Sequence, residues 1–125
     1  MTVKDKVGRK RYILVNTSTS SLQRGRLIHL VNKKFNRFSL RENLPRESNP
    51  PWLTVLDSDY AIFKCWHREK ATMVEFLEGL ELTPGYSGSD RVPPITLKVL
   101  KVSGTIKKLK KKIDRYQIMR GVNRG

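Results

Sequence analysis

The sequence predicts an α+β fold, a ferredoxin-like or RRM-like sandwich built in the order βαββαβ and extended by a C-terminal basic helix. Runs with strand character occupy residues 11–15, 52–56, 60–66 and 95–102. The segments after the first and third of these runs carry apolar residues at helical spacing. This order favours a four-stranded antiparallel sheet with two helices on one face.

The first strand, residues 11–15, is followed by a helix start signal. Ser20 with Gln23 three residues later forms a capping box, which places the helix N-terminus at Ser20. The core stripe of this helix comprises Leu27, Leu30, Val31 and Phe35. Periodicity is lost in residues 36–51, where three prolines predict a loop.

Two strands around Asp57, Ser58 and Asp59 predict a hairpin with a tight turn. Residues 68–82 then carry Met73, Leu77 and Leu80 at helical spacing, so they predict a helix that stops at Thr83. A loop over residues 85–94 leads to the last strand.

Residues 95–120 change period in the middle. They alternate like a strand up to Val102, and after Gly104 the apolar residues fall at helical spacing. The stripe comprises Ile106, Leu109, Ile113 and Tyr116, and the opposite arc comprises Lys107, Lys108, Lys110, Lys111, Lys112 and Arg115. We therefore expect a helix with one buried stripe and one cationic face.

The cationic face destabilises its own helix. Lys107 and Lys108 sit at the positive end of the helix dipole, which costs roughly 0.3–1 kcal/mol per cation. Lysines three and four residues apart repel by about 0.2–0.5 kcal/mol per pair. A charge run is often only a solvated face, but single-signed charge at the wrong helix end favours an anionic partner, which the exposed amides of the helix start would also bind.

Composition supports such a partner. The chain has 26 Lys and Arg against 11 Asp and Glu, a net charge of +15 over 125 residues, which is typical of proteins that bind nucleic acid or an anionic membrane surface. Neither a spanning segment nor a signal peptide is evident, and the single Cys65 cannot form an internal disulfide. We expect a cytoplasmic protein.

The predicted domain organisation is a basic arm over residues 1–10, one domain over residues 11–120 and a tail over residues 121–125. Arg9, Lys10 and Arg11 lie where the arm meets the domain. The arm is either a disordered terminus or a segment that contacts phosphates directly.

No group of residues resembles a catalytic centre. Asp57 and Asp59 are better explained by a turn than by a divalent ion, and zinc would need His29 and His67 at unsuitable spacing. Cys65 within a strand is a weak candidate nucleophile. The run of residues 60–66 has aromatic residues but not the RRM base-stacking pattern, so Tyr60 and Trp66 are expected in a core or interface.

Three stretches carry a resemblance to a known family. VLKVSGTIKKLKKK (residues 99–112), preceded by the strand from residue 95, resembles the C-terminal signature of archaeal ribonuclease P protein component 2, a small-subunit family shared with eukaryotes. KRYILV resembles the first strand of that family, and AIFKCWHREKATMVEFLEGL its third strand and second helix. The similarity covers most of residues 9–115 and is weakest at residues 36–51.

The resemblance implies a non-catalytic subunit of ribonuclease P, the ribonucleoprotein endoribonuclease that removes 5′ leaders from precursor tRNA. It implies that catalysis belongs to the RNA, with Mg²⁺ at RNA phosphates and no cofactor on this chain. The implied partners are ribonuclease P RNA, precursor tRNA through the complex, and a TIM-barrel-like protein subunit. A self-dimer within a heterotetramer is also implied.

The resemblance also assigns site residues. Phosphate contacts fall to Lys101, Lys107, Lys108, Lys110, Lys111 and Lys112, and the corner that admits the RNA backbone falls to Ser103, Gly104 and Thr105. Arg115, Arg9, Lys10 and Arg11 extend this predicted RNA-binding set. Candidates for the partner surface are Trp52, Trp66, Val122 and residues 36–51.

Two other functions remain open. A ribosomal protein or RNA chaperone would be equally basic and equally free of a catalytic centre, and copurification with a ribonuclease P type RNA would separate it from a ribonuclease P subunit. A membrane-surface protein would need an amphipathic helix whose apolar stripe is free to insert.

Overall fold

The computed structural model describes residues 9–18, 23–45, 48–82, 86–87, 90–91 and 95–124. The elements are β1 (Lys10–Asn16), α2 (Arg24–Arg41), β2 (Trp52–Asp57), β3 (Tyr60–Trp66), the 3-10 turn η1 (His67–Glu69), α3 (Lys70–Leu77), β4 (Glu81–Leu82), β5 (Tyr86–Ser87), β6 (Asp90–Arg91), β7 (Ile95–Thr96), β8 (Lys98–Ser103) and α4 (Ile106–Arg124). The order of the long elements confirms the predicted βαββαβ sandwich with an added helix.

The main sheet has the strand order β2-β3-β1-β8, and every neighbouring pair is antiparallel. β1 and β2 are joined through α2, and β3 lies between them, which is the split arrangement of the ferredoxin-like fold. The register places Leu14 opposite Ile62 and Tyr12 opposite Ser103. The first and last long strands are therefore neighbours.

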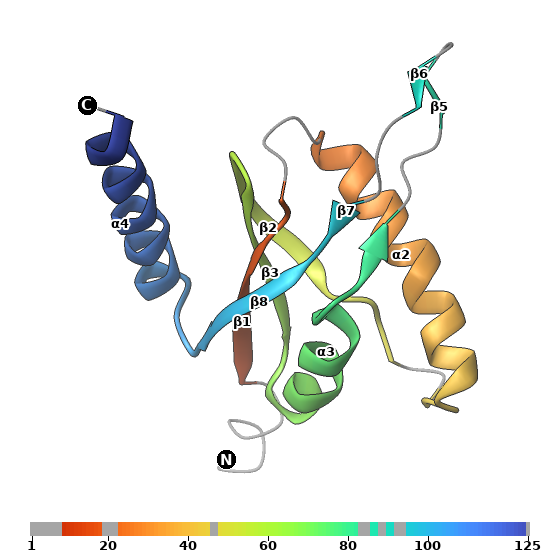
Figure 1. The fold of residues 1–125 in the computed structure, drawn as a ribbon. Helices are drawn as coiled ribbons and strands as arrows, with labels where there is room; N and C mark the ends of the chain where they lie inside the picture. Colours follow the sequence, from red (N-terminus) through yellow and green to blue (C-terminus); the bar gives the residue numbers. More distant parts are fainter. Residues whose placement is uncertain are drawn as a thin grey trace.

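Helices cover both faces of this sheet (Figure 1), with α2 and α3 on one side and α4 on the other. Alternation along β1 sends Ile13 and Val15 to the core under α2 and α3, whereas Leu14 enters a second core with Leu109 and Ile113 of α4. Phe35, Phe38 and Phe76 pack together in the first core, with Phe35 edge-on to Phe76 at 5.3 Å between ring centroids.

The helix α2 differs from the prediction at both ends. It begins at Arg24 with Gln23 in the N-cap position and no side-chain cap, so the predicted capping box is wrong, and Ser20 lies outside the described residues. It continues to Arg41, five residues beyond the predicted start of the loop at residue 36, because Phe38 adds one more turn of buried stripe. The loop between α2 and β2 is correspondingly shorter.

The predicted helix over residues 68–82 is also too long. α3 ends at Leu77, and Gly79 at φ 72° reverses the chain, donating from its backbone N–H to the Leu97 carbonyl. Glu81 and Leu82 then pair with Thr96 and Ile95, so the predicted strand over residues 95–102 is split into β7 and β8 at Leu97. β5 and β6 fall inside the predicted loop over residues 85–94; residues 83–85 and the remainder of that loop lie outside the described residues.

Candidate nucleic-acid interface

The corner between β8 and α4 is formed by Ser103, Gly104 and Thr105. The Thr105 N–H donates to Ser103 Oγ at 3.2 Å, which turns the chain sharply from strand into helix. A Cβ added to Gly104 would lie 3.2 Å from Arg11 Nη1, so the corner packs directly against the guanidinium of β1. The predicted corner is therefore present, and Arg11 lies under it.

The helix α4 is fixed to the sheet by the predicted apolar stripe. Leu109 and Ile113 are fully buried, while Ile106 and Tyr116 are half-buried. Further along the helix, the Tyr116 ring stacks on Tyr60 at 5.6 Å between ring centroids. Gln117 Nε2 also donates to Asp57 Oδ1 at 3.1 Å, next to the β2–β3 turn. The helix thus runs across the sheet from the end of β8 to this hairpin.

The position of α4 determines which part of this sheet face is accessible. Tyr60 is only 5% exposed, because Tyr116 covers it, which confirms the prediction that it belongs to a core. The α4 side of the sheet is the face on which an RRM stacks bases. Here its centre is occupied by Leu109 and Ile113 instead.

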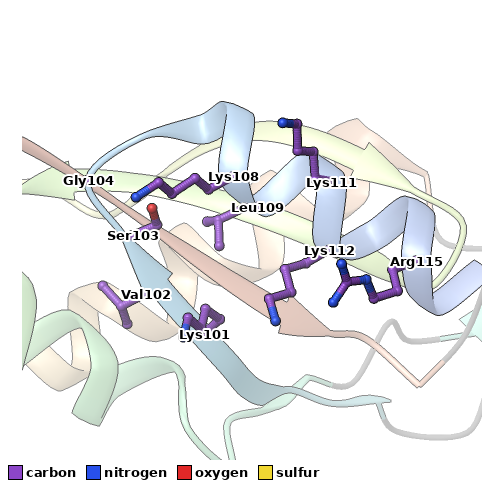
Figure 2. Close-up of a pocket in the computed structure, with 9 residues that line it drawn as sticks. All are labelled: Lys101, Val102, Ser103, Gly104, Lys108, Leu109, Lys111, Lys112 and Arg115. Atoms are coloured by element: carbon purple, nitrogen blue, oxygen red, sulfur yellow. The ribbon is translucent and has the colours of Figure 1, made fainter.

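A groove of about 560 Å³ separates β8 from the cationic face of α4 (Figure 2). Its lining comprises Lys101, Val102, Ser103, Gly104, Lys108, Leu109, Lys111, Lys112 and Arg115. Lys108 extends toward Ser103, Lys112 and Arg115 extend to one side of the helix, and Lys111 extends to the other side (Figure 2). Seven residues of the predicted RNA-binding set therefore meet in one groove.

The other predicted residues lie outside this groove. Thr105, Lys107 and Lys110 are exposed on the corner and on α4. Arg9 and Lys10 are exposed at the start of β1, and residues 1–8 of the predicted arm lie outside the described residues. Arg11, which also belongs to the predicted set, lies at the corner, a position that was not predicted. The antiparallel pairing of the first and last strands is the signal that would have placed it there. Prediction from the sequence also missed Val102 as part of the groove wall.

The groove has no counter-charge of its own. Five of its lining residues are cations and none is acidic. Among the side chains that the structure describes, the single ion pair joins Arg41 Nε to Glu42 Oε2 at 3.4 Å, at the end of α2. The lining of the groove is therefore positively charged, and a groove between low-dielectric walls concentrates this potential.

Positive charge also gathers at the end of β3. His67 donates its backbone N–H to the Arg9 carbonyl at 2.7 Å. The pKa of the His67 imidazole is lowered from 6.5, first by desolvation and then by the nearby cations of Arg11, Lys70 and Arg9. This corner of the molecule is consequently a second cationic region on the described surface.

The acidic and histidine candidates are not clustered in the part of the chain that the structure describes. Asp59 is buried in the β2–β3 turn, where its Oδ2 accepts from Asn16 Nδ2 at 3.4 Å, and Ser58 takes a φ of 55°. The predicted hairpin is thus confirmed. Over the described residues, His, Cys, Asp and Glu side chains nowhere gather in threes, and none of the helices there has the length and apolarity to cross a membrane.

Cys65 is 3% exposed, and the pKa of its thiol is raised from 9.0 to about 11, first by burial and second by Glu69. At pH 8 its thiolate fraction is on the order of one in a thousand. We expect iodoacetamide to alkylate the folded protein at pH 8 at least about a hundredfold more slowly than glutathione, and urea-unfolded protein at a rate near that of glutathione. Mass spectrometry over time measures both rates, and rapid stoichiometric alkylation of the folded chain would contradict the buried placement.

Comparison with known proteins finds similarity among solved structures but not among sequences. No family model and no curated protein matches the sequence. A chain in the cryo-EM structure of yeast ribonuclease MRP is similar with a TM-score of 0.44 and 13% sequence identity, over 91% of this chain and 95% of that chain. This similarity describes the path of the two chains and assigns no role to individual residues.

Proposed function

We propose that this chain is a non-catalytic, RNA-binding subunit of ribonuclease P and that the groove between β8 and α4 holds the RNA backbone. The observation that carries the proposal is the set of five cations in one groove without a counter-charge. Phosphate contacts of this kind supply affinity and position without reading sequence. The resemblance of residues 9–115 to the ribonuclease P small-subunit family is the reason for proposing ribonuclease P RNA as the ligand.

The spacing of the cations suits a phosphate backbone. Lys108, Lys112 and Arg115 extend over about 10 Å of helix axis. In double-stranded DNA, one strand presents a phosphate about every 3.4 Å along the duplex axis, so a row of this length is comparable to about three consecutive phosphates of a nucleic-acid strand. Lys101 on β8 approaches from the other wall. A backbone lying in the groove would therefore be held from two sides.

The proposal leaves the cleavage chemistry to the RNA. We propose that Mg²⁺ binds to RNA phosphates at the cleavage site and that this chain supplies no catalytic residue. The TIM-barrel-like subunit, precursor tRNA and a second copy of this chain are its proposed partners, in the cytoplasm. The neutral, buried thiol of Cys65 fits a chain that contributes positioning and charge rather than a nucleophile.

The membrane alternative is disfavoured by the packing of α4. A helix that binds a bilayer surface inserts its apolar stripe into the acyl boundary. Here Leu109 and Ile113 already pack against Leu14 and Ile62 of the sheet. Insertion would require the helix to leave its own core.

Reconstitution tests the proposed function. We expect the isolated chain to cleave no precursor tRNA, and we expect the cognate ribonuclease P RNA with the other protein subunits to cleave faster at limiting Mg²⁺ when this chain is added, because its cations reduce repulsion between RNA phosphates. Single-turnover cleavage of 5′-labelled precursor tRNA, with and without the chain, measures both. Turnover by protein alone would contradict the non-catalytic assignment. An unchanged rate in its presence would instead favour a ribosomal protein or RNA chaperone.

A further inference from the structure

An aromatic and cationic cluster lies on the α4 side of the sheet, at the corner that α4 does not cover. Trp52 of the edge strand β2 is 42% exposed, and its ring meets the half-buried Trp66 edge-on at 6.1 Å between centroids. Lys64 Nζ lies 5.2 Å from the centroid of the Trp52 ring. We name Trp52, Lys64 and Trp66 the tryptophan corner.

The sheet register connects the tryptophan corner to the groove. Trp52 pairs with Lys64, Lys64 with Tyr12, and Tyr12 with Ser103, which lines the groove. Cross-strand partners share one face of a sheet, and neighbouring strands are about 4.8 Å apart, so the row extends about 14 Å from Ser103 to Trp52. α4 crosses toward the β2–β3 turn and leaves the Trp52 end of this row open.

The surroundings favour an anionic strand over a protein partner. Lys10 of β1 is the cross-strand partner of Trp66. Next to this pair, the Arg9 carbonyl accepts a hydrogen bond from the His67 backbone N–H. Protein interfaces are depleted in lysine at their centres, whereas single-stranded nucleic acid is bound by aromatic faces set in a positively charged surface. An indole flanked by lysines matches the second pattern.

We propose that the tryptophan corner stacks an unpaired base of the RNA strand whose phosphates occupy the groove. This inference rests on the proposed function and adds a second kind of contact to it. Stacking depends little on salt, whereas the groove contacts weaken steeply as salt rises. The chain would therefore hold a junction, with a backbone fixed in the groove and an unpaired segment laid across the row from Ser103 to Trp52.

Intrinsic fluorescence reports on this site because Trp52 and Trp66 are the only two tryptophans of the chain. We expect a single-stranded 12-nucleotide oligouridylate to quench the emission of the full-length chain. Trp52→Ala should weaken binding of this oligonucleotide roughly five- to a hundredfold, which is the contribution of one stacked base to affinity. The slope of log affinity against log salt should not change. Trp52→Phe should retain most of the affinity, because phenylalanine keeps an aromatic face.

A matched control is Leu40→Ala, which removes another exposed large apolar side chain, on α2. Circular dichroism establishes that each variant is folded. Unquenched emission at saturating oligonucleotide, or equal affinity of Trp52→Ala and the unaltered chain, would overturn the proposal. Unchanged RNA affinity with weakened assembly onto a protein subunit would overturn it in favour of a protein interface. Oligonucleotide binding does not depend on cleavage, so the two proposals can fail separately. If the oligonucleotide quenches the fluorescence but the chain does not stimulate cleavage in the reconstitution, the tryptophan corner remains a base-stacking site and only the ribonuclease P role is rejected.

Discussion

Replacing Lys108, Lys112 and Arg115 together by glutamine is expected to weaken binding of structured RNA on the order of a hundredfold or more near physiological salt. These three cations line the groove and have no acidic partner there. Loss of about three phosphate contacts should also reduce the slope of log affinity against log salt by about two to three. Titration of ribonuclease P RNA at several salt concentrations measures both quantities.

The control is a variant with the same loss of charge on the opposite layer of the molecule. Lys33, Lys34 and Arg37 of α2 match the groove set in residue types and in exposure. Their replacement by glutamine should leave the salt slope nearly unchanged. If both variants weaken RNA binding equally, net charge rather than the groove determines affinity, and the site assignment is wrong.

The groove variant should at the same time be slightly more stable than the unaltered chain. Lys108 and Lys112 are four residues apart on one helix, where like charges repel by about 0.2–0.5 kcal/mol per pair. Removal of these charges should therefore raise the free energy of unfolding by a few tenths of a kcal/mol. A residue set that lowers stability and raises affinity for a polyanion has a binding role rather than a structural one.

The fold class could be predicted from the sequence because its signals are local. The β-rich apolar runs of β1 and β3 and the apolar stripe of α4 can each be recognised within one element, and each is present in the structure. The end of α3 depended on other parts of the chain. Leu80 fits the helical spacing, yet Gly79 turns the backbone, and the Leu80 carbonyl accepts a hydrogen bond from the Leu97 N–H outside the helix.

The candidate site could be predicted in part for the same reason. The lysines of α4 are visible as one face of a helix, but the opposite wall with Lys101 requires the position of β8 beside β1. The tryptophan corner could not be predicted as a unit. Trp52 and Trp66 are fourteen positions apart, and only the register of β2 on β3 brings their rings together.

Truncation of Ile113 to alanine is expected to cost about 2–5 kcal/mol of unfolding free energy. Ile113 is 1% exposed and lies with Leu109 in the second core, so its truncation leaves a cavity against Leu14 and Ile62. Urea denaturation followed by circular dichroism measures the change. Among the α4 side chains that the structure describes, none belongs to the core under α2 and α3, so the remaining sheet should persist while the helix loosens.

Ile118→Ala makes the identical chemical change five residues further along the same helix, where the side chain is 65% exposed. Its effect on stability should stay within about 0.5 kcal/mol. Because α4 forms one wall of the groove, Ile113→Ala should also weaken RNA binding without removal of any charge, whereas Ile118→Ala should not. Equal RNA affinity of the two variants would mean that the α4 lysines bind RNA through their charge alone, whether or not α4 is packed against the sheet. Weaker binding by Ile113→Ala alone would show that the packed helix is what arranges the cations for the phosphate backbone.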